Sequence, residues 1–190
     1  LPDASLRARI APTEKQNENW LRGTVHDPRA AALEGVAGHA GLFSTAHGLA
    51  LYANLMLGGT SAEHRAVLGA ATIAEMTTAR DVAGQKRGLG WDMRSKYSSN
   101  RGELYSPAAF GHGGFTGTAM WIDPELDLFV IFLSSRLHPD GQGSVNDLAG
   151  RIGTVAAAAI VGANAGANSP SNAVAETATP VVLGIDVLVR

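Results

Sequence analysis

The 190-residue sequence contains no cysteine, which excludes disulfide bonds, thiolate metal sites and cysteine nucleophiles. Its basic residues are scattered and its net charge is −2, so no positive stripe exists for a phosphate backbone and we predict no nucleic-acid partner. No run approaches the roughly 18 to 20 apolar residues that a membrane span needs. No two histidines have the spacing of a metal site beside a carboxylate, so we predict no metal and no cofactor.

Two signatures of serine hydrolases are also missing. The chain has three lysines, and the residues three positions before them are Pro12, Ala83 and Met93, so the S-x-x-K pattern is absent. No G-x-S-x-G elbow occurs either. The sequence starts at Leu1 without a signal-peptide pattern and stops at Arg190 inside an apolar stretch. We therefore interpret the chain as a fragment of a longer protein.

Hydrophobic residues make up 45% of the chain, which is enough for a packed core. Apolar residues at helical spacing predict an amphipathic helix over 45–57, with Ser44 or Thr45 as its N-cap. A second short helix is predicted over 70–78. Tyr52 begins a Y-x-N pattern, but it falls on the apolar face of its helix, so we predict that it belongs to the core.

The second half of the chain changes to strand periodicity. Four segments have this pattern: 88–92, 109–114, 118–122 and 128–134. The run 128–133 is apolar on both faces, which predicts a central strand covered on both sides. Residues 123–127 are predicted to form the turn before it, with proline presetting φ. A last long helix, rich in alanine, is predicted over 145–161.

The densest candidate site is the segment from Phe110 to Thr118, which places four glycines around His112. Glycines inside strands often mark a place where a ligand or another backbone comes close. A histidine among them could act as a base or donate a hydrogen bond to a developing charge. The alternative is a tight hairpin with a structural histidine, and spacing alone leaves both open.

The other histidines are weaker candidates. His26 and Asp27 could form a polarised pair, although Asp27-Pro28 is also an ordinary start of a turn. His47 and His64 are predicted to be exposed to solvent.

Five segments, in this order, resemble the β-lactamase-related serine hydrolases, the family of class C β-lactamases, DD-peptidases and related esterases. They are Gly38 to Ala46 (G-L-x-S-T-A type), Leu68 to Thr77, Arg87 to Trp91 (G-L-G-W type), Gly111 to Gly117 (K-[ST]-G or H-[ST]-G type) and Asp123-Pro124 with the strand after it. The resemblance covers about residues 1–161. It implies a mixed α/β (α+β) fold, in which an antiparallel sheet is flanked by helices and lies beside a helical subdomain.

The resemblance also implies roles for single residues. His112 matches the Lys or His of the family's triad and would support the proton relay or the leaving group. The backbone N–H of Phe115 matches one of two oxyanion-hole donors, while Gly113, Gly114 and Thr116 would contact substrate. The nucleophilic Ser, its Lys and the Tyr of Y-x-N would lie upstream of Leu1, leaving this fragment inactive alone. Because Gly113 replaces the triad's Ser or Thr and His112 stands for its Lys, an ester or amide with another acyl group is favoured over a β-lactam or a D-Ala-D-Ala peptide.

We divide the chain into the later part of this hydrolase domain (1–161), a linker (162–179) and the truncated start of a second domain (180–190). Val182 to Leu188 resembles the opening strand of a peptidoglycan exo-N-acetylmuramidase-type domain. Together these resemblances imply a periplasmic or extracellular protein with a small-molecule or peptidoglycan-derived acyl substrate. Two alternatives stay open: a non-catalytic glycan- or peptide-binding module on the same fold, and a hydrolase of another class with a pairing such as His112 and Asp92.

Overall fold

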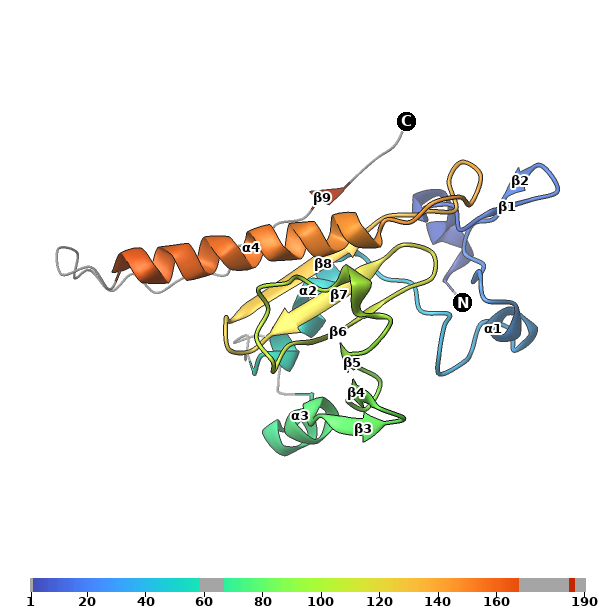
Figure 1. Cartoon of the computed structure of the whole chain (residues 1–190). Helices are drawn as coiled ribbons and strands as arrows, with labels where there is room; N and C mark the ends of the chain where they lie inside the picture. Colours follow the sequence, from blue (N-terminus) through green and yellow to red (C-terminus); the bar gives the residue numbers. More distant parts are fainter. Residues whose placement is uncertain (1, 59–66, 168–184, 187–190) are drawn as a thin grey trace.

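A seven-stranded sheet forms the centre of the structure, a computed structural model that describes residues 2–58, 67–167 and 185–186 (Figure 1). In sheet order its strands are β3 (Arg80–Val82), β4 (Gln85–Arg87), β5 (Asp92–Arg94), β6 (Phe110–Gly113), β7 (Ala119–Asp123), β8 (Leu128–Leu133) and β9 (Ile185–Asp186). All neighbouring strands are antiparallel except β8 and β9, which are parallel. This order places β6, the strand of His112, in the middle of the sheet.

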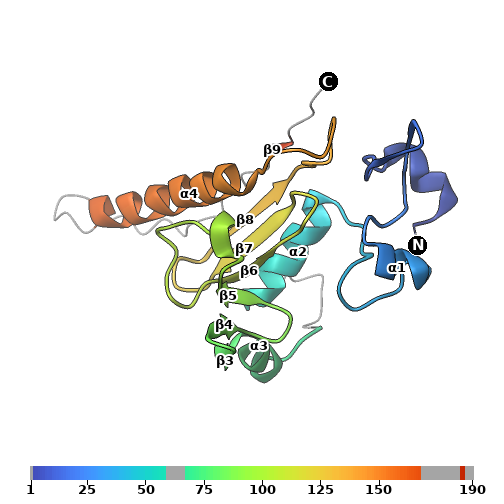
Figure 2. The ribbon, with the colours of Figure 1, turned by 45° about the vertical axis from the view of Figure 1, so that its right-hand side comes forward.

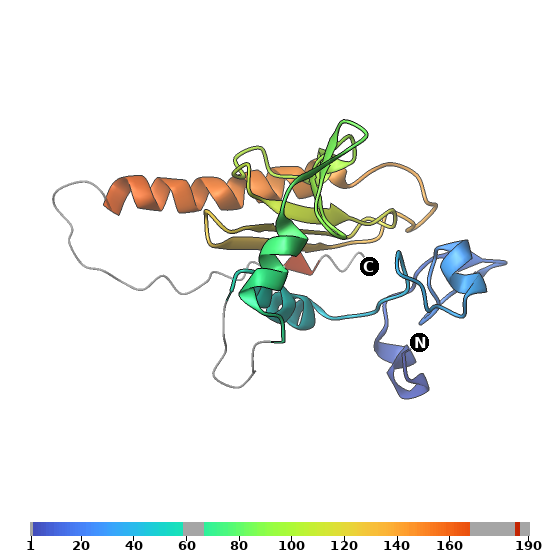
Figure 3. The ribbon, with the colours of Figure 1, turned by 90° about the horizontal axis from the view of Figure 1, so that it is seen from below.

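Helices cover both faces of this sheet, as the sequence predicts. The α-helices of the described residues are α1 (Pro28–Ala32), α2 (Ala46–Met56), α3 (Ala70–Thr77) and α4 (Asn146–Ala167). Figure 3 shows α4 above the sheet and α2 below it, and both helices contact β8. The predicted antiparallel sheet with helices on both sides is therefore confirmed.

The alternation of side chains along the strands produces two separate cores. The core under α4 contains Trp121, Val130, Phe132 and Ala157 among others. The core under α2 contains six buried residues: Ala53, Met56, Trp91, Met93, Phe110 and Ile122. Neighbouring residues of a strand point to opposite faces, so Trp121 and Ile122 serve different cores.

The predicted helices agree with the structure except at the end of the chain. Thr45 caps α2 by accepting a hydrogen bond from the backbone N–H of Gly48 at 3.1 Å. The last helix, α4, continues to Ala167, six residues beyond the predicted end and into the predicted linker. Extending an existing helix needs no new nucleus, so α4 continues through three alanines of 162–167 even though Gly162, Asn164 and Gly166 separate them. The rest of the predicted linker, 168–179, lies outside the described residues, and the proposed second domain stays a prediction.

Strand predictions hold for β6, β7 and β8 but need two corrections. The segment 88–92 is mostly a turn, closed by a hydrogen bond from Gly88 N–H to Trp91 O of 3.0 Å, and β5 starts only at Asp92. Strand β8 is covered on both faces as predicted, but it is next to the edge strand rather than central. Its apolar character reflects the helices above and below it, which periodicity cannot distinguish from a central place in the sheet.

The hairpin of β3 and β4 was not predicted. Its two-residue turn places Ala83 and Gly84 at positive φ, 51° and 74°. Alanine rarely adopts this conformation, so the sequence carries no recognisable hairpin signal there. Tertiary pairing with β5 holds the turn in place.

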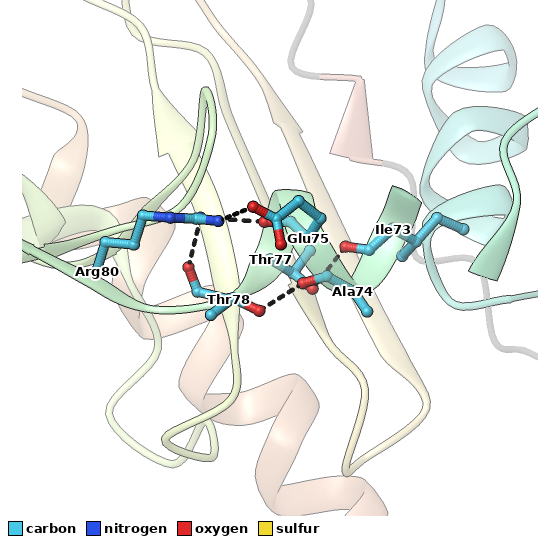
Figure 4. Close-up of polar contacts among 6 residues, drawn as sticks. All are labelled: Ile73, Ala74, Glu75, Thr77, Thr78 and Arg80. Carbon is cyan, nitrogen blue, oxygen red and sulfur yellow. Dashed lines mark hydrogen bonds and ion pairs between the residues drawn. The ribbon is translucent and has the colours of Figure 1, made fainter. Parts of the chain in front are cut away.

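Side chains rather than a glycine close the C-terminal end of α3 (Figure 4). The hydroxyls of Thr77 and Thr78 donate to carbonyls four residues earlier, at 2.9 and 2.7 Å. Arg80 donates to the carbonyl of Glu75 at 3.0 Å and also pairs with its carboxylate. The contacts to Ala74 and Glu75 satisfy carbonyls among the last four of the helix, which have no partner inside it, just before strand β3 begins.

The N-terminal segment, residues 2–45, lies to one side of the sheet (Figure 2). It contains a 3₁₀ helix (Ala4–Arg9), the short hairpin of β1 (Lys15–Gln16) and β2 (Asn19–Trp20), and α1. Only Gly23 and Ala30 are buried in it.

Candidate active site

His112 lies near the end of β6, on the sheet face that α2 covers. It is two residues after the buried Phe110 and opposite Met120 of β7, yet its own side chain is exposed. Its Nδ1 lies 2.8 Å from the carbonyl oxygen of Gly113. A carbonyl can only accept, so Nδ1 carries the proton and Nε2 of the neutral ring keeps a lone pair. The arrangement presents a hydrogen-bond acceptor or base to solvent.

Two glycines of β6 face the opposite side, where protein atoms fill the space. A Cβ at Gly111 would overlap the ring of Trp121 and the carbonyl of Met120. A Cβ at Gly113 would overlap the side-chain amide of Asn100, whose oxygen accepts a hydrogen bond from Trp121 Nε1 at 2.9 Å. The Ser or Thr that the resemblance expects at position 113 therefore has no room. These two glycines are explained by packing and do not themselves indicate a ligand.

The turn between β6 and β7 fixes the direction of the Phe115 N–H. The carbonyl of Gly114 accepts from Gly117 N–H at 3.0 Å, and Gly114 N–H donates to Thr118 O at 2.6 Å. In a trans peptide the C=O and N–H point in opposite directions, so Phe115 N–H points out of the turn. Within the described part of the chain it donates no hydrogen bond. Gly117 closes the turn at a φ of +112°, which favours glycine.

The side chain of Phe115 is 66% exposed and contacts two groups from distant parts of the chain. Its ring stacks with the imidazole of His26, with 5.2 Å between ring centroids. The guanidinium carbon of Arg136 lies 4.2 Å from the same centroid. The backbone N–H of Arg136 also donates to the carbonyl of Thr116 at 2.8 Å. All five predicted site residues thus share one hairpin end, with Phe115 at its exposed tip.

Sequence reasoning missed both partners of Phe115. Arg136 lies 21 positions away along the chain and belongs to no motif. The sequence suggests a pair of His26 with Asp27 only. In the structure His26 instead stacks on Phe115, and its Nε2 lies 3.6 Å from Glu14 Oε2. Neither contact has a local signal, because each joins loops that only the fold brings together.

Asp27 pairs with His39 instead of its neighbour His26. Its Oδ1 lies 2.9 Å from His39 Nε2 and also accepts from the backbone N–H groups of Arg29 and Ala30, at 3.0 and 2.8 Å. The Ala30 N–H and the His39 ring hold the pKa of Asp27 below its ordinary value. Asp27 is thus the N-cap of α1, and the suggested pair with His26 is wrong.

Two further residues raised by the sequence belong to the structural framework. The carboxylate of Asp92 is buried, and its Oδ2 accepts hydrogen bonds from the hydroxyls of Ser95 and Ser98, each at 3.0 Å. Among the described residues it forms no hydrogen bond with His112, so the suggested pairing of these two has no support. Tyr52 packs against the core under α2, where burial raises its pKa, in agreement with the core role predicted for it.

Residues 2–58, 67–167 and 185–186 contain neither a cluster of metal ligands nor a membrane-spanning helix. Over these ranges no three His, Asp or Glu side chains gather as metal ligands would. None of the helices there has the length and apolar character needed to cross a bilayer.

Known proteins similar to this chain in sequence indicate its family. A family model described as Beta-lactamase matches residues 2–154. Proteins of Salmonella gallinarum, Salmonella paratyphi B and Salmonella newport, each named "Putative D-alanyl-D-alanine carboxypeptidase", are 37% identical over 132 residues. The match covers 67% of this chain but 30% of each relative, so the chain spans about a third of their length.

The fold is also found in a solved structure. The crystal structure of a beta-lactamase from Mycobacterium bovis superposes with a TM-score of 0.50 at 26% sequence identity. The superposition covers 64% of this chain and 46% of that one. The similarity extends to the antiparallel sheet and its flanking helices.

Proposed function

This chain belongs to the Beta-lactamase family and has its fold, and from that premise we propose that it supplies the later half of the active site of a serine acyl-transfer hydrolase. The rest of the site would come from the remainder of a longer protein. Two facts support this division. The 190 residues contain no S-x-x-K pattern, and the chain spans about a third of its relatives.

The single observation that carries the proposal is the orientation of the Phe115 N–H. It points out of a hydrogen-bonded turn, makes no hydrogen bond within the described chain, and lies three residues after His112. An N–H held in this way is the kind of donor that stabilises the oxyanion of a tetrahedral intermediate. Removing one such donor typically lowers kcat by about 10²- to 10³-fold.

His112 is proposed to act through Nε2. Its Nδ1 is hydrogen-bonded to the Gly113 carbonyl, so Nε2 is the nitrogen left to exchange a proton with the nucleophile or substrate. It would accept a proton in the relay from the nucleophile or donate one to the leaving group. Gly114 and Thr116 would contact the bound acyl group, and the backbone of Gly113, at the end of β6, would lie beside it.

The proposed substrate is an ester or amide that forms an acyl-enzyme. The relatives carry the name of a carboxypeptidase acting on D-alanyl-D-alanine, which supports a peptide amide from peptidoglycan. Asn100 fills the place of the triad hydroxyl beside Gly113, which weighs against β-lactam recognition through that hydroxyl. A peptidoglycan substrate would place the protein in the periplasm or outside the cell.

The decisive experiment is intact-protein mass spectrometry after incubation with a fluorophosphonate and, separately, with a penicillin. Both the 190-residue chain and the gene product extended upstream would be treated. We expect a fluorophosphonate adduct only on the extended product, and slower reaction of its His112→Ala variant. An adduct on the 190-residue chain would contradict a nucleophile supplied from elsewhere.

A second result would change the class of the protein. If neither form is labelled but the extended product binds soluble peptidoglycan fragments in calorimetry, it is a binding module on the same fold. Labelling by fluorophosphonate but not by penicillin would support the ester or amide specificity argued from Asn100.

A further inference from the structure

Arg136, in the loop between β8 and α4, directs its polar contacts to backbone carbonyls. Its Nε donates to Phe115 O at 2.8 Å, and its Nη1 donates to Gly141 O at 2.8 Å and to Gly143 O at 3.3 Å. Its own N–H donates to Thr116 O at 2.8 Å. One residue therefore ties the β6–β7 turn to the loop that leads into α4.

These contacts act on the peptide that follows the Phe115 N–H. The preceding peptide is held because Gly114 O accepts from Gly117 N–H. The following peptide is held because Phe115 O accepts from the Arg136 guanidinium. With both flanking peptides fixed, the backbone of Phe115 has no remaining freedom to turn its N–H. Without the Arg136 side chain, Phe115 O loses its donor, and only backbone hydrogen bonds restrain that direction: the two inside the turn and the one from the N–H of residue 136 to Thr116 O.

The chemistry of the guanidinium suits this task. Within the described chain no carboxylate lies within 4.0 Å of Arg136, so its donors serve carbonyls. A planar fork can donate to carbonyls in two directions while its face lies on an aromatic ring, here that of Phe115. An ammonium group has neither the fork nor the flat face, so lysine can replace it only in part.

We propose that Arg136 is a positioning residue that orients the Phe115 N–H for the oxyanion of the acyl-transfer reaction. This inference rests on the proposed function, and it assigns to the β8–α4 loop a part in catalysis without contact with the substrate. Misplacing a catalytic group by about 1 Å can lower the rate by about 10²-fold, which sets the expected size of the effect.

Arg101 provides a matched control. Its guanidinium also serves carbonyls, those of Gly102 at 3.3 Å, Tyr105 at 3.2 Å and Ser106, and lies 5.7 Å from the centre of the Tyr105 ring. It therefore has the same kind of structural role away from the β6–β7 turn. A general loss of packing should affect both variants, whereas a loss of positioning should affect only one.

The kinetic test uses the extended gene product and hydrolysis of a p-nitrophenyl ester. Oxyanion stabilisation exists only in the transition state, so Arg136→Gln should lower kcat by about 30- to 100-fold with KM within about threefold. Arg136→Lys should recover part of kcat, and Arg101→Gln should keep kcat within about threefold of the wild type. Equal loss in the two glutamine variants, or a wild-type kcat in Arg136→Gln, would overturn the proposal.

Amide hydrogen exchange on the same proteins tests the mechanism directly. Arg136→Gln should speed exchange of the Gly117 N–H by about tenfold or more, since the turn can then open locally, and Arg101→Gln should not. Unchanged exchange would overturn the positioning role. The proposed function fails separately, if the wild type takes up no fluorophosphonate. If the wild type reacts and Arg136→Gln reacts equally fast, only the inference fails.

Discussion

The sheet with its two helices and the N-terminal segment are held together in different ways. From α2 to α4, buried side chains fill both cores, and strands that follow one another along the chain are neighbours in the sheet. Residues 2–45 bury only Gly23 and Ala30 and contact the rest through loop side chains. Trp20 stacks on His138 with 4.0 Å between ring centroids, and His138 Nε2 lies 3.0 Å from Pro12 O.

This contrast teaches that the two regions should respond to mutation differently. Buried apolar area sets the free energy of global unfolding, whereas a segment held by a few exposed contacts can open on its own. The candidate site lies where the two regions meet, since His26 of the N-terminal segment stacks on Phe115. Matched substitutions, one in each region, test whether the two regions differ in stability as expected.

A pair of tryptophans should show the largest difference. Trp121 is 3% exposed in the core under α4, and Trp121→Ala should lower the free energy of unfolding by about 3–5 kcal/mol. Trp20 is 39% exposed, and Trp20→Ala should lower it by at most about 1.5 kcal/mol. Urea denaturation followed by circular dichroism measures both. Equal losses would show that the N-terminal segment is part of the same cooperative unit.

The buried Asp123 of the sheet should show the next largest effect. Asp123 is fully buried and accepts hydrogen bonds from Ser106 N–H and hydroxyl, at 2.6 and 2.7 Å, and from the backbone N–H groups of Glu125 and Leu126. Asp123→Ala leaves these donors unsatisfied and should cost about 3 kcal/mol of unfolding free energy. A loss below about 1 kcal/mol would mean that water replaces the carboxylate and that the turn into β8 is less closed than described.

Two glycines should separate the regions by a steric effect. Gly111→Ala brings a methyl group into the Trp121 ring and the Met120 carbonyl and should cost about 1–3 kcal/mol or prevent folding. Gly38→Ala, in the N-terminal segment, meets no atom within 4 Å and should change stability by less than about 0.5 kcal/mol. Thermal unfolding by differential scanning fluorimetry compares the two. A neutral Gly111→Ala would refute the close packing of β6 on Trp121.

The smallest effect is a pH dependence confined to the N-terminal segment. The pKa of Asp27 is lowered in the folded chain, chiefly by the Ala30 N–H and then by His39. Its stabilising contribution is therefore present above the unfolded value, near 3.8, and is lost as the pH falls through the lowered folded pKa. Asp27→Ala should thus be cut faster than the wild type by limited proteolysis within residues 2–45 at pH 7, with global unfolding unchanged.

The control for this prediction is the same comparison at low pH. Hydrogen exchange within residues 2–45 is measured for Asp27→Ala and the wild type at pH 7 and again below pH 3. The difference in exchange rate between the two proteins should shrink at the lower pH, because the wild-type carboxylate takes up its proton. A difference that persists undiminished would assign the effect to α1 packing instead of the charged cap.

Local rules of side-chain choice were enough to predict several elements of the fold. Helix α2 with its Thr45 cap, helix α3, strands β6 to β8 and the glycine-rich hairpin around His112 were predictable from periodicity, capping and glycine placement. The family followed from the order of these segments. Local patterns suffice here because neighbouring strands pair through short turns and each buried face shows in the alternation of residues.

Contacts between groups far apart along the chain could not be predicted and follow from the folded arrangement. It placed Arg136 and His26 on Phe115, Asn100 against Gly113, and His39 on Asp27. None of these pairs has a fixed spacing, because side chains from separate loops are brought together by packing elsewhere. The hairpin that contains the Phe115 N–H can thus be predicted from local sequence. The orientation of this N–H, as we propose, depends on Arg136, which only folding brings to the hairpin.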